Sequence, residues 1–392
     1  MAIKGAFNVP FTQMREYINA KKAVLPSETW QGIDFAAHSH AFAITGAVKL
    51  EFLHDVKKSI EDAANNGTGF AKWKKQFRAA VKGHGGDNEI NTKPSGEVTA
   101  TEAGNLHIPL LSKWRQRVIY ETNMKSAYAA GKYARLTDED GLTNFPYWQY
   151  VHGYYGKPNE PRDEHVKWDG MILPANHPWF DTHFPPNGWN CNCGVEQISA
   201  KEAKVTERPS GKNDVPPEWA TNVGINDAAG AQSLMRHIER ISSKGGEYKI
   251  IAQKAFEHLK ENSAKIYGKT LDVWVDEVFD GNYTKQKKER TVAITDEGII
   301  TADKESVNHA IRTKKPTQQR LSREQAKELP AFIADAESVY EDKKNGGLLY
   351  FKKLNDEKEV KISVKNNKFI TAVKQNNKES QGNIEYKRGL KR

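Results

Sequence analysis

The sequence is poor in cysteine and in long apolar runs, and each scarcity excludes a class of protein. Only two of the 392 residues are cysteine, too few for the disulfide framework of a small secreted domain. No run of eighteen apolar residues occurs, and the N-terminal residues MAIKGAFNVPFTQM lack the apolar core of a signal peptide. We therefore expect a soluble chain that is made in the cytoplasm and has no contact with a membrane.

Length and charge set the next bounds. A chain of 392 residues predicts two or three domains, and 38% hydrophobic residues suffice for packed cores. The formal net charge of +9 favours a polyanionic partner, although a solvated basic surface explains it equally well. From Lys361 to Arg392, nine basic residues stand against two acidic ones, a net +7. Such residues bind phosphates without sequence preference, and a solvated tail is the alternative for residues 387–392.

The N-terminal third has helical periodicity. Apolar residues recur at helical spacing between Phe35 and Lys82, with a stop at Asn65–Gly67, where Asn and Gly accept a left-handed C-cap. A further helix is predicted from about Leu110 to Leu136. Its small residues Ala127–Gly131 favour close helix packing. The alternative is that the basic residues beside them face nucleic acid or a partner protein.

The stretch Arg162–Val195, called the signature segment below, contains both cysteines, Cys191 and Cys193. It is rich in Trp, Pro, Gly and Asn, a composition that neither a helix nor a regular strand tolerates. We predict an irregular turn structure pinned by side chains, in which Trp179, Trp189 and both cysteines are mostly buried. An aromatic strand, predicted within residues 143–158, leads into it.

The cysteines raise the question of a metal. His165, His177 and His183 precede them, and thiolate and imidazole suit zinc. Structural zinc sites, however, usually have Cys-x2-4-Cys spacing, so a one-residue gap makes it awkward for both sulfurs to reach one ion. We favour small buried apolar thiols and predict no metal and no cofactor. A nucleophilic cysteine is disfavoured, because no neighbouring residue marks a paired base.

The signature segment resembles that of the phage Mu F-like minor head proteins. The resemblance rests on an Arg-x-x-His step, a following Gly, a Pro-Pro-x-Gly turn and a terminal Asn-Cys-x-Cys. Asn192 departs from it, since the family usually has Arg there. With the upstream helices, it covers roughly residues 30–200. It implies a head morphogenesis protein of the virion, made in the host bacterial cytoplasm and located at the portal or capsid interior, with portal and capsid proteins as partners.

The region after about Asp272 predicts a second folded domain. LDVWVDEVFD is β-like, a helical stretch follows, and three strand-like pieces predict an antiparallel meander. This block resembles the nuclease-like domains of the barnase–EndoU–colicin type that are fused to Mu F-like proteins. The predicted fold class is therefore α+β: a helical N-terminal block with a small irregular β-hairpin region, a linker, and a separate C-terminal α+β domain with an antiparallel sheet. The predicted domains are 1–200, 201–264 (linker or arm with a connecting helix) and 265–392.

The nuclease resemblance implies a metal-independent endoribonuclease. Such an enzyme needs a proton-transfer group and cations for the charge that develops on phosphorus. His309 suits proton transfer because an imidazole titrates near neutral pH. The remaining candidates are a catalytic set and a nucleic-acid-binding set: catalytic Lys314, Thr371 and Lys374; nucleic-acid-binding Arg312, Lys315, Lys361, Lys365 and Lys368. A histidine at a helix end is also often a simple cap, so the sequence does not decide whether the domain is active.

Two function classes follow. The first is a structural minor head protein whose basic C-terminal domain lies near packaged DNA. The second is a ribonuclease toxin delivered through a Mu F-like module, with RNA as substrate and an immunity protein as a further partner. A neighbouring portal gene favours the first, and a small acidic reading frame immediately downstream favours the second.

Overall fold

A computed structural model describes most of the chain. The described residues are 12–21, 23–27, 37–39, 41–86, 90, 109–153, 162–206, 215–225, 228–281, 289–311, 319–342, 345–376 and 386–390. The predicted loop at residues 83–104 and the end of the predicted strand at residues 154–158 lie largely outside them. No helix in these ranges is long and apolar enough to cross a membrane.

The chain forms two compact units, and the α+β class is confirmed. The first unit comprises Met1–Ile225 and Ser233–Ala255, and the second comprises Asn226–Gln232 and Phe256–Arg392. The domain bounds that the sequence suggested, 1–200, 201–264 and 265–392, stay a prediction.

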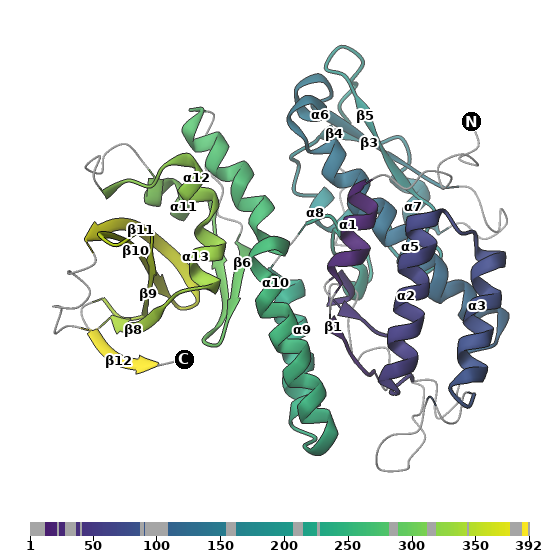
Figure 1. Cartoon of the computed structure of the whole chain (residues 1–392). Helices are drawn as coiled ribbons and strands as arrows, with labels where there is room; N and C mark the ends of the chain where they lie inside the picture. Colours follow the sequence, from purple (N-terminus) through teal and green to yellow (C-terminus); the bar gives the residue numbers. More distant parts are fainter. Residues whose placement is uncertain are drawn as a thin grey trace. The chain divides into compact units, whose positions relative to one another are not determined.

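The first unit begins with a helical layer (Figure 1). Its elements are α1 (Thr12–Ala20), β1 (Ala23–Val24), η3 (Ala37–Ser39), β2 (Ala41–Phe42), α2 (Leu50–Asn66), α3 (Phe70–Gly83) and α5 (Lys113–Leu136). Trp73 and Phe77 of α3 are fully buried and stack with ring centroids 4.9 Å apart. The small residues Ala127, Ala129 and Ala130 of α5 are buried, as close helix packing requires.

The end of α2 confirms one sequence prediction, and its beginning corrects another. Gly67 has φ 62° and its N–H donates to the carbonyl of Ala63, which is the left-handed C-cap expected there. The helical periodicity seen from Phe35 is wrong for the first turns, because α2 begins only at Leu50. Before it, β1 and β2 pair in parallel, and this pairing takes the backbone bonds that a helix would need.

The second layer of this unit carries the signature segment. It comprises α6 (Glu139–Asn144), β3 (Tyr147–Val151), α7 (Asp163–Lys167), β4 (Ile172–Pro174), α8 (Phe180–His183), β5 (Gly194–Ile198) and η4 (Pro217–Trp219). The strands form an antiparallel sheet in the order β4-β3-β5. On β3, Trp148 and Tyr150 are fully buried while their neighbours are partly exposed, so one face of the strand packs into the core. The aromatic strand is core, as the sequence favoured.

Two long helices follow, α9 (Ala228–Ser242) and α10 (Gly246–Phe279). The strand-like interpretation of LDVWVDEVFD is wrong, because Leu271–Phe279 form the last nine residues of α10. Leu271, Trp274 and Val275 are buried on one face at spacings of three and four residues, the helical period. β-branched and aromatic content misled the prediction, since packing overrides this weak local preference.

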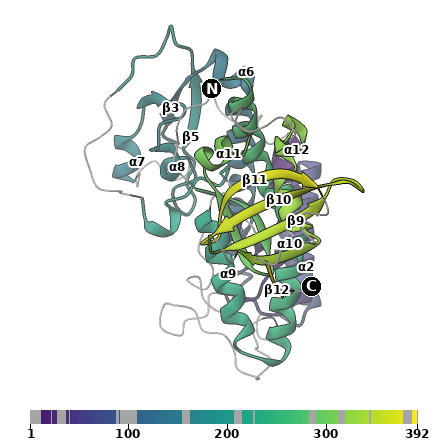
Figure 2. The same cartoon turned by 90° about the vertical axis from the view of Figure 1, so that its left-hand side faces the viewer.

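The second unit is built on a seven-stranded sheet in the order β12-β8-β9-β10-β11-β7-β6. The elements are β6 (Arg290–Thr295), β7 (Gly298–Ala302), α11 (Lys304–Ile311), α12 (Arg323–Lys327), α13 (Leu329–Ala334), β8 (Ser338–Asp342), β9 (Leu348–Lys353), β10 (Lys358–Lys365), β11 (Lys368–Asn376) and β12 (Tyr386–Leu390). Strands β9, β10 and β11 form the predicted antiparallel meander and lie side by side in Figure 2. Strand β8 pairs with β9 as a further antiparallel strand, so the helix predicted to reach Asp342 is wrong for Ser338–Asp342. The sheet is mixed rather than wholly antiparallel, because β11 pairs with β7 in parallel at Lys368 and Thr301.

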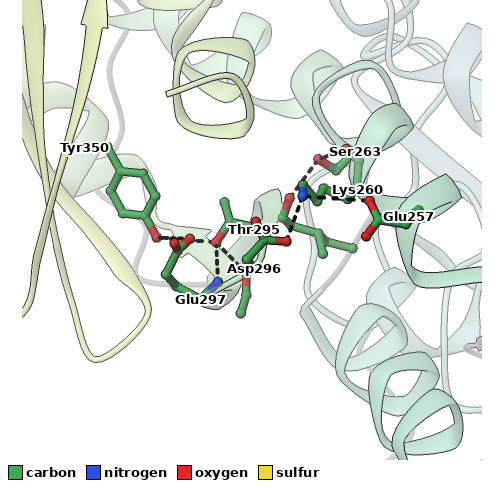
Figure 3. Close-up of polar contacts among 9 residues, drawn as sticks. Glu257, Lys260, Ser263, Thr295, Asp296, Glu297 and Tyr350 are labelled. Atoms are coloured by element: carbon green, nitrogen blue, oxygen red, sulfur yellow. Dashed lines mark hydrogen bonds and ion pairs between the residues drawn. The ribbon is translucent and has the colours of Figure 1, made fainter. Parts of the chain in front are cut away.

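Polar contacts fix the later part of α10 to the β6–β7 hairpin (Figure 3). The Lys260 ammonium donates to Asp296 Oδ1 at 2.7 Å, and Ser263 is fully buried with its hydroxyl near the carbonyl of Ile294. On the other side of the hairpin, the Tyr350 hydroxyl contacts Thr295 Oγ1 at 3.3 Å. Hydrogen bonds and an ion pair thus connect the helix, the hairpin and the meander within this unit.

Candidate functional site in the signature segment

Arg162 joins the beginning of the signature segment to its turn. It lies just before α7, and its Nη2 donates to the carbonyl oxygen of Trp189 at 2.6 Å. The guanidinium also lies against Gly188: a Cβ at that position would be 2.9 Å from Nη1. A larger residue there would push the guanidinium aside from its present position. The Arg-x-x-His step and the Pro-Pro-x-Gly turn, distant in sequence, therefore form one structural unit.

His165 lies one helical turn after Arg162, so both residues share a face of the chain at α7. Its ring is buried and stacks on Trp168 with centroids 4.9 Å apart and planes inclined by 20°. Its Nδ1 is 3.8 Å from Cys191 Sγ and 3.5 Å from Cys193 Sγ. The imidazole and both thiols thus converge on one point inside the segment.

The two cysteines have different environments. Cys191 is buried and Cys193 is partly buried against the same core, so the expectation that both thiols are mostly buried is confirmed. A hydrogen bond from Cys193 lowers the pKa of the Cys191 thiol against the opposing effect of burial. The same hydrogen bond and burial raise the pKa of Cys193. Burial and the neighbouring thiols also raise the pKa of Tyr150, whose hydroxyl donates to Asn187 Oδ1 at 3.1 Å.

The other histidines of the segment take part in packing and turns. His183 is buried and stacks on Trp179 with ring centroids 4.2 Å apart. His177 Nδ1 accepts a hydrogen bond from the Trp179 backbone N–H at 3.2 Å. Of the three histidines noted in the sequence, His165 is therefore the one that lies beside both cysteine thiols.

The tryptophans correct one expectation. Trp179 is buried as predicted, but Trp189 is 39% exposed. The following residue, Asn190, has φ 59°, so the chain turns sharply there. Trp189 consequently packs on one side only, edge-on against the buried Trp219 with centroids 4.9 Å apart.

Comparison with known proteins shows which family this part of the chain is similar to. Residues 54–196 match the family model described as "Phage Mu protein F like protein". The matched range contains most of α2, all of α3 and α5, and the complete signature segment. Residues 54–196 form a Mu F-like domain. The resemblance seen in the sequence is confirmed for this part of the chain.

Two curated proteins align with part of this chain. The "Putative capsid assembly protein F" of Escherichia phage Mu is 30% identical over 169 residues, which cover 43% of this chain and 36% of that protein. The "Mu-like prophage FluMu F protein" of Haemophilus influenzae is 30% identical over 217 residues, covering 55% and 48%. This chain therefore spans less than half the length of either relative. No solved structure matches it.

The predicted catalytic residues after the Mu F-like domain are only partly placed. Arg312, Lys314 and Lys315 lie outside the described residues. His309 is partly buried in the last turn of α11, which packs against β11. The helix that carries His309 thus packs against the strand that carries Thr371 and Lys374, two of the three other catalytic candidates.

The strand alternation separates those two candidates. Lys374 is paired with Val360, and Ala372 with Ile362, which places Lys374 on the face of the sheet that packs against the helices. Thr371 is paired with Ser363 and lies on the opposite face. The register therefore places one of the two, Lys374, on the face that α11 covers.

The predicted phosphate-binding lysines also differ in their surroundings. Lys368 donates to Asp303 Oδ2 at 2.6 Å and lies 3.1 Å from Glu289 Oε1, so two carboxylates balance its charge. Lys365 is exposed and donates to the carbonyl of Asn345 at 2.8 Å. Lys361 is partly exposed on β10. The pairing of Lys368 gave no signal in the sequence, because its partners are distant along the chain.

Proposed function

We propose that this protein is a minor head component of a tailed phage and takes part in capsid assembly. The observation that carries the proposal is the Mu F-like domain with its assembled signature segment. Arg162 contacts the Gly188 turn and His165 meets both cysteines, so the Arg-x-x-His step, the turn and the Cys-x-Cys pair lie together. The printed name of the phage Mu relative, a putative capsid assembly protein, supports the same role.

The location that we propose is the virion, at the portal or the capsid interior, with portal and capsid proteins as partners. Residues from Lys361 to Arg392 carry a net +7, which suits a position beside packaged DNA. Salt would weaken such contacts, because they rest on phosphate neutralisation and counterion release.

Complementation of a phage or prophage from which the gene is deleted tests this role. Wild-type protein should restore full heads, and Arg162→Ala should not, because it frees the turn that carries the cysteines. Lys167→Ala is the matched control: Lys167 is exposed on the same helix, and its loss should leave head assembly normal. Normal yields of filled heads in the deletion strain without complementation would refute the proposal.

A second proposal concerns the C-terminal unit, which we infer to be a metal-independent endoribonuclease. It is supported by the position of His309 on α11 against β11, with Lys374 on the strand face that α11 covers. In this role His309 would exchange the proton of the 2′-hydroxyl or the leaving oxygen, and Lys374 would stabilise the phosphate. The activity would make the protein a toxin delivered through its Mu F-like domain, with an immunity protein as its specific inhibitor.

Incubation of the full chain with RNA and with DNA, with and without chelator, tests the second proposal. RNA cleavage should persist in chelator, and His309→Ala should lower the rate about 10²–10⁴-fold. Salt-sensitive RNA binding should survive this change, because it depends on phosphate charge. His258→Ala, at a largely exposed position of α10, is the control. Binding of RNA without any cleavage by the wild-type chain would leave a basic nucleic-acid-binding appendage of a head protein.

A further inference from the structure

The cluster of His165, Cys191 and Cys193 has the composition of a metal site. Each residue offers one ligand atom, and these three atoms all lie within 4.8 Å of one another. The histidine and Cys191 are buried, and Cys193 is partly exposed. Imidazole and thiolate together are ligands that zinc and other borderline-soft transition metals prefer to magnesium or calcium.

The distances fit a tetrahedral ion. With Zn–S bonds of about 2.3 Å and Zn–N bonds of about 2.0 Å, tetrahedral geometry places sulfur about 3.5 Å from nitrogen. The Nδ1 of His165 lies 3.5 Å from Cys193 Sγ and 3.8 Å from Cys191 Sγ. A small adjustment of side chains would therefore be enough to seat an ion between the three atoms.

The backbone explains how cysteines one residue apart converge. Asn190 has φ 59° and turns the chain, and residues 191–193 before β5 then alternate in burial as in a strand, with Cys191 buried, Asn192 exposed and Cys193 partly buried. In extended backbone, residues i and i+2 point to the same side, so both thiols face α7. The spacing that appeared awkward in the sequence is thus compatible with one ion, because the imidazole approaches from a different element.

We propose that His165 Nδ1, Cys191 Sγ and Cys193 Sγ bind one zinc ion per chain. Within the described part of the chain the group supplies three protein ligands, so water or an additional ligand completes the tetrahedron. Binding releases the thiol protons to solvent as the two sulfurs coordinate. The ion would link α7 directly to the chain before β5, and would thereby hold together the two ends of the signature segment. This role is independent of the proposed place of the protein in the phage head.

A disulfide between the same cysteines is the competing chemistry. Residues i and i+2 hold their Cα atoms near the limit that a disulfide allows, so the bond would be strained. A disulfide would also leave the His165 ring facing sulfur that can no longer act as a thiolate ligand. The metal uses all three groups, and the disulfide uses two.

Metal analysis of the full-length protein, purified without chelator under reducing conditions, tests the proposal. The wild type should contain about one zinc per chain. His165→Ala, Cys191→Ser and Cys193→Ser should each lose most of it. His177→Ala is the matched control, since His177 belongs to the same segment but lies outside the cluster, and it should retain the metal.

A cobalt titration of the wild type keeps the test independent of whether the variants fold. After zinc is removed with a chelator, Co²⁺ should produce the thiolate charge-transfer band and the visible bands of a tetrahedral site, saturating at one equivalent. Zn²⁺ should then abolish both bands and raise the thermal midpoint. A folded wild type without zinc that gives no cobalt bands would overturn the proposal, as would a native Cys191–Cys193 disulfide.

Discussion

Replacement of Trp168 tests the packing of the signature segment most sharply. Trp168 is 1% exposed, stacks on His165 and meets the edges of Tyr150 and Trp179 at centroid distances of 5.5 and 5.8 Å. A buried Trp→Ala change costs about 3–5 kcal/mol. Because each lost aromatic pair adds about 0.5–1.5 kcal/mol beyond area burial, we expect the upper end of that range.

Domains are stable by only roughly 5–15 kcal/mol, so Trp168→Ala would remove a large fraction of the free energy of unfolding. The milder substitution Trp168→Phe is therefore the variant to measure. We expect it to cost about 1–3 kcal/mol, since much of the volume and part of the ring contact remain. Trp114→Phe is the control, because Trp114 is 54% exposed and should change stability by less than about 0.5 kcal/mol.

Urea denaturation followed by tryptophan fluorescence measures these changes. Eight of the nine tryptophans precede residue 225, so the signal reports mainly on the first unit. Equal midpoints for Trp168→Phe and Trp114→Phe would refute the packing described for the segment.

Further predictions concern a close contact and an ion pair. Gly224→Ala would place a Cβ 2.4 Å from Tyr133 Cβ and should cost about 1–3 kcal/mol by overpacking. Gly83→Ala meets nothing within 4 Å, so its thermal midpoint should not fall, and equal midpoints for the two variants would contradict the contact. Burial raises the pKa of Asp303, but its hydrogen bonds to Lys368 and Ser306 outweigh this and lower the pKa below the usual 3.8. Because the folded pKa is the lower one, this stabilisation exists above pH 3.8 and disappears as the pH falls through the folded value. Lys368→Met should therefore cost about 1–2 kcal/mol at pH 7, in a partly exposed pair, and less in acid. Unfolding followed by circular dichroism should show a stability deficit that shrinks as the pH is lowered below 3.8, and a deficit that stays constant with pH would contradict it.

Local signals in the sequence predicted the elements whose structure depends on local chemistry. The Gly67 cap follows from the freedom of glycine at positive φ, and the meander β9–β11 follows from alternating apolar residues between turn residues. The end of α10 did not follow, because Val273 and Val275 favour strands locally while burial at helical spacing decides the structure.

The sequence predicted which residues of the signature segment matter, but it did not predict the contacts between them. Arg162, His165 and the cysteines stood out as a motif, but the sequence gave no distance between them. The convergence depends on the Asn190 turn, which requires a rare backbone conformation, and on the contact between Arg162 and Gly188. These two residues lie more than twenty positions apart, so no local signal predicts their contact. The exposure of Trp189 has the same cause.

The C-terminal candidates show a different limit. Thr371 and Lys374 were grouped by proximity along β11, yet an odd spacing in a strand places side chains on opposite faces. Lys368 appeared as a free cation, yet it is held by Asp303 and Glu289. Charge counts along a chain cannot reveal such pairings, because the partners come from other elements.

Quantitative mass spectrometry of purified proheads and mature particles tests the central claim most directly. The phage or prophage that encodes this chain should yield proheads in which the protein is present at a fixed ratio to the portal protein. The ratio should persist after washing at high salt for a component that is built into the head. Absence of the protein from both proheads and mature particles would contradict the account.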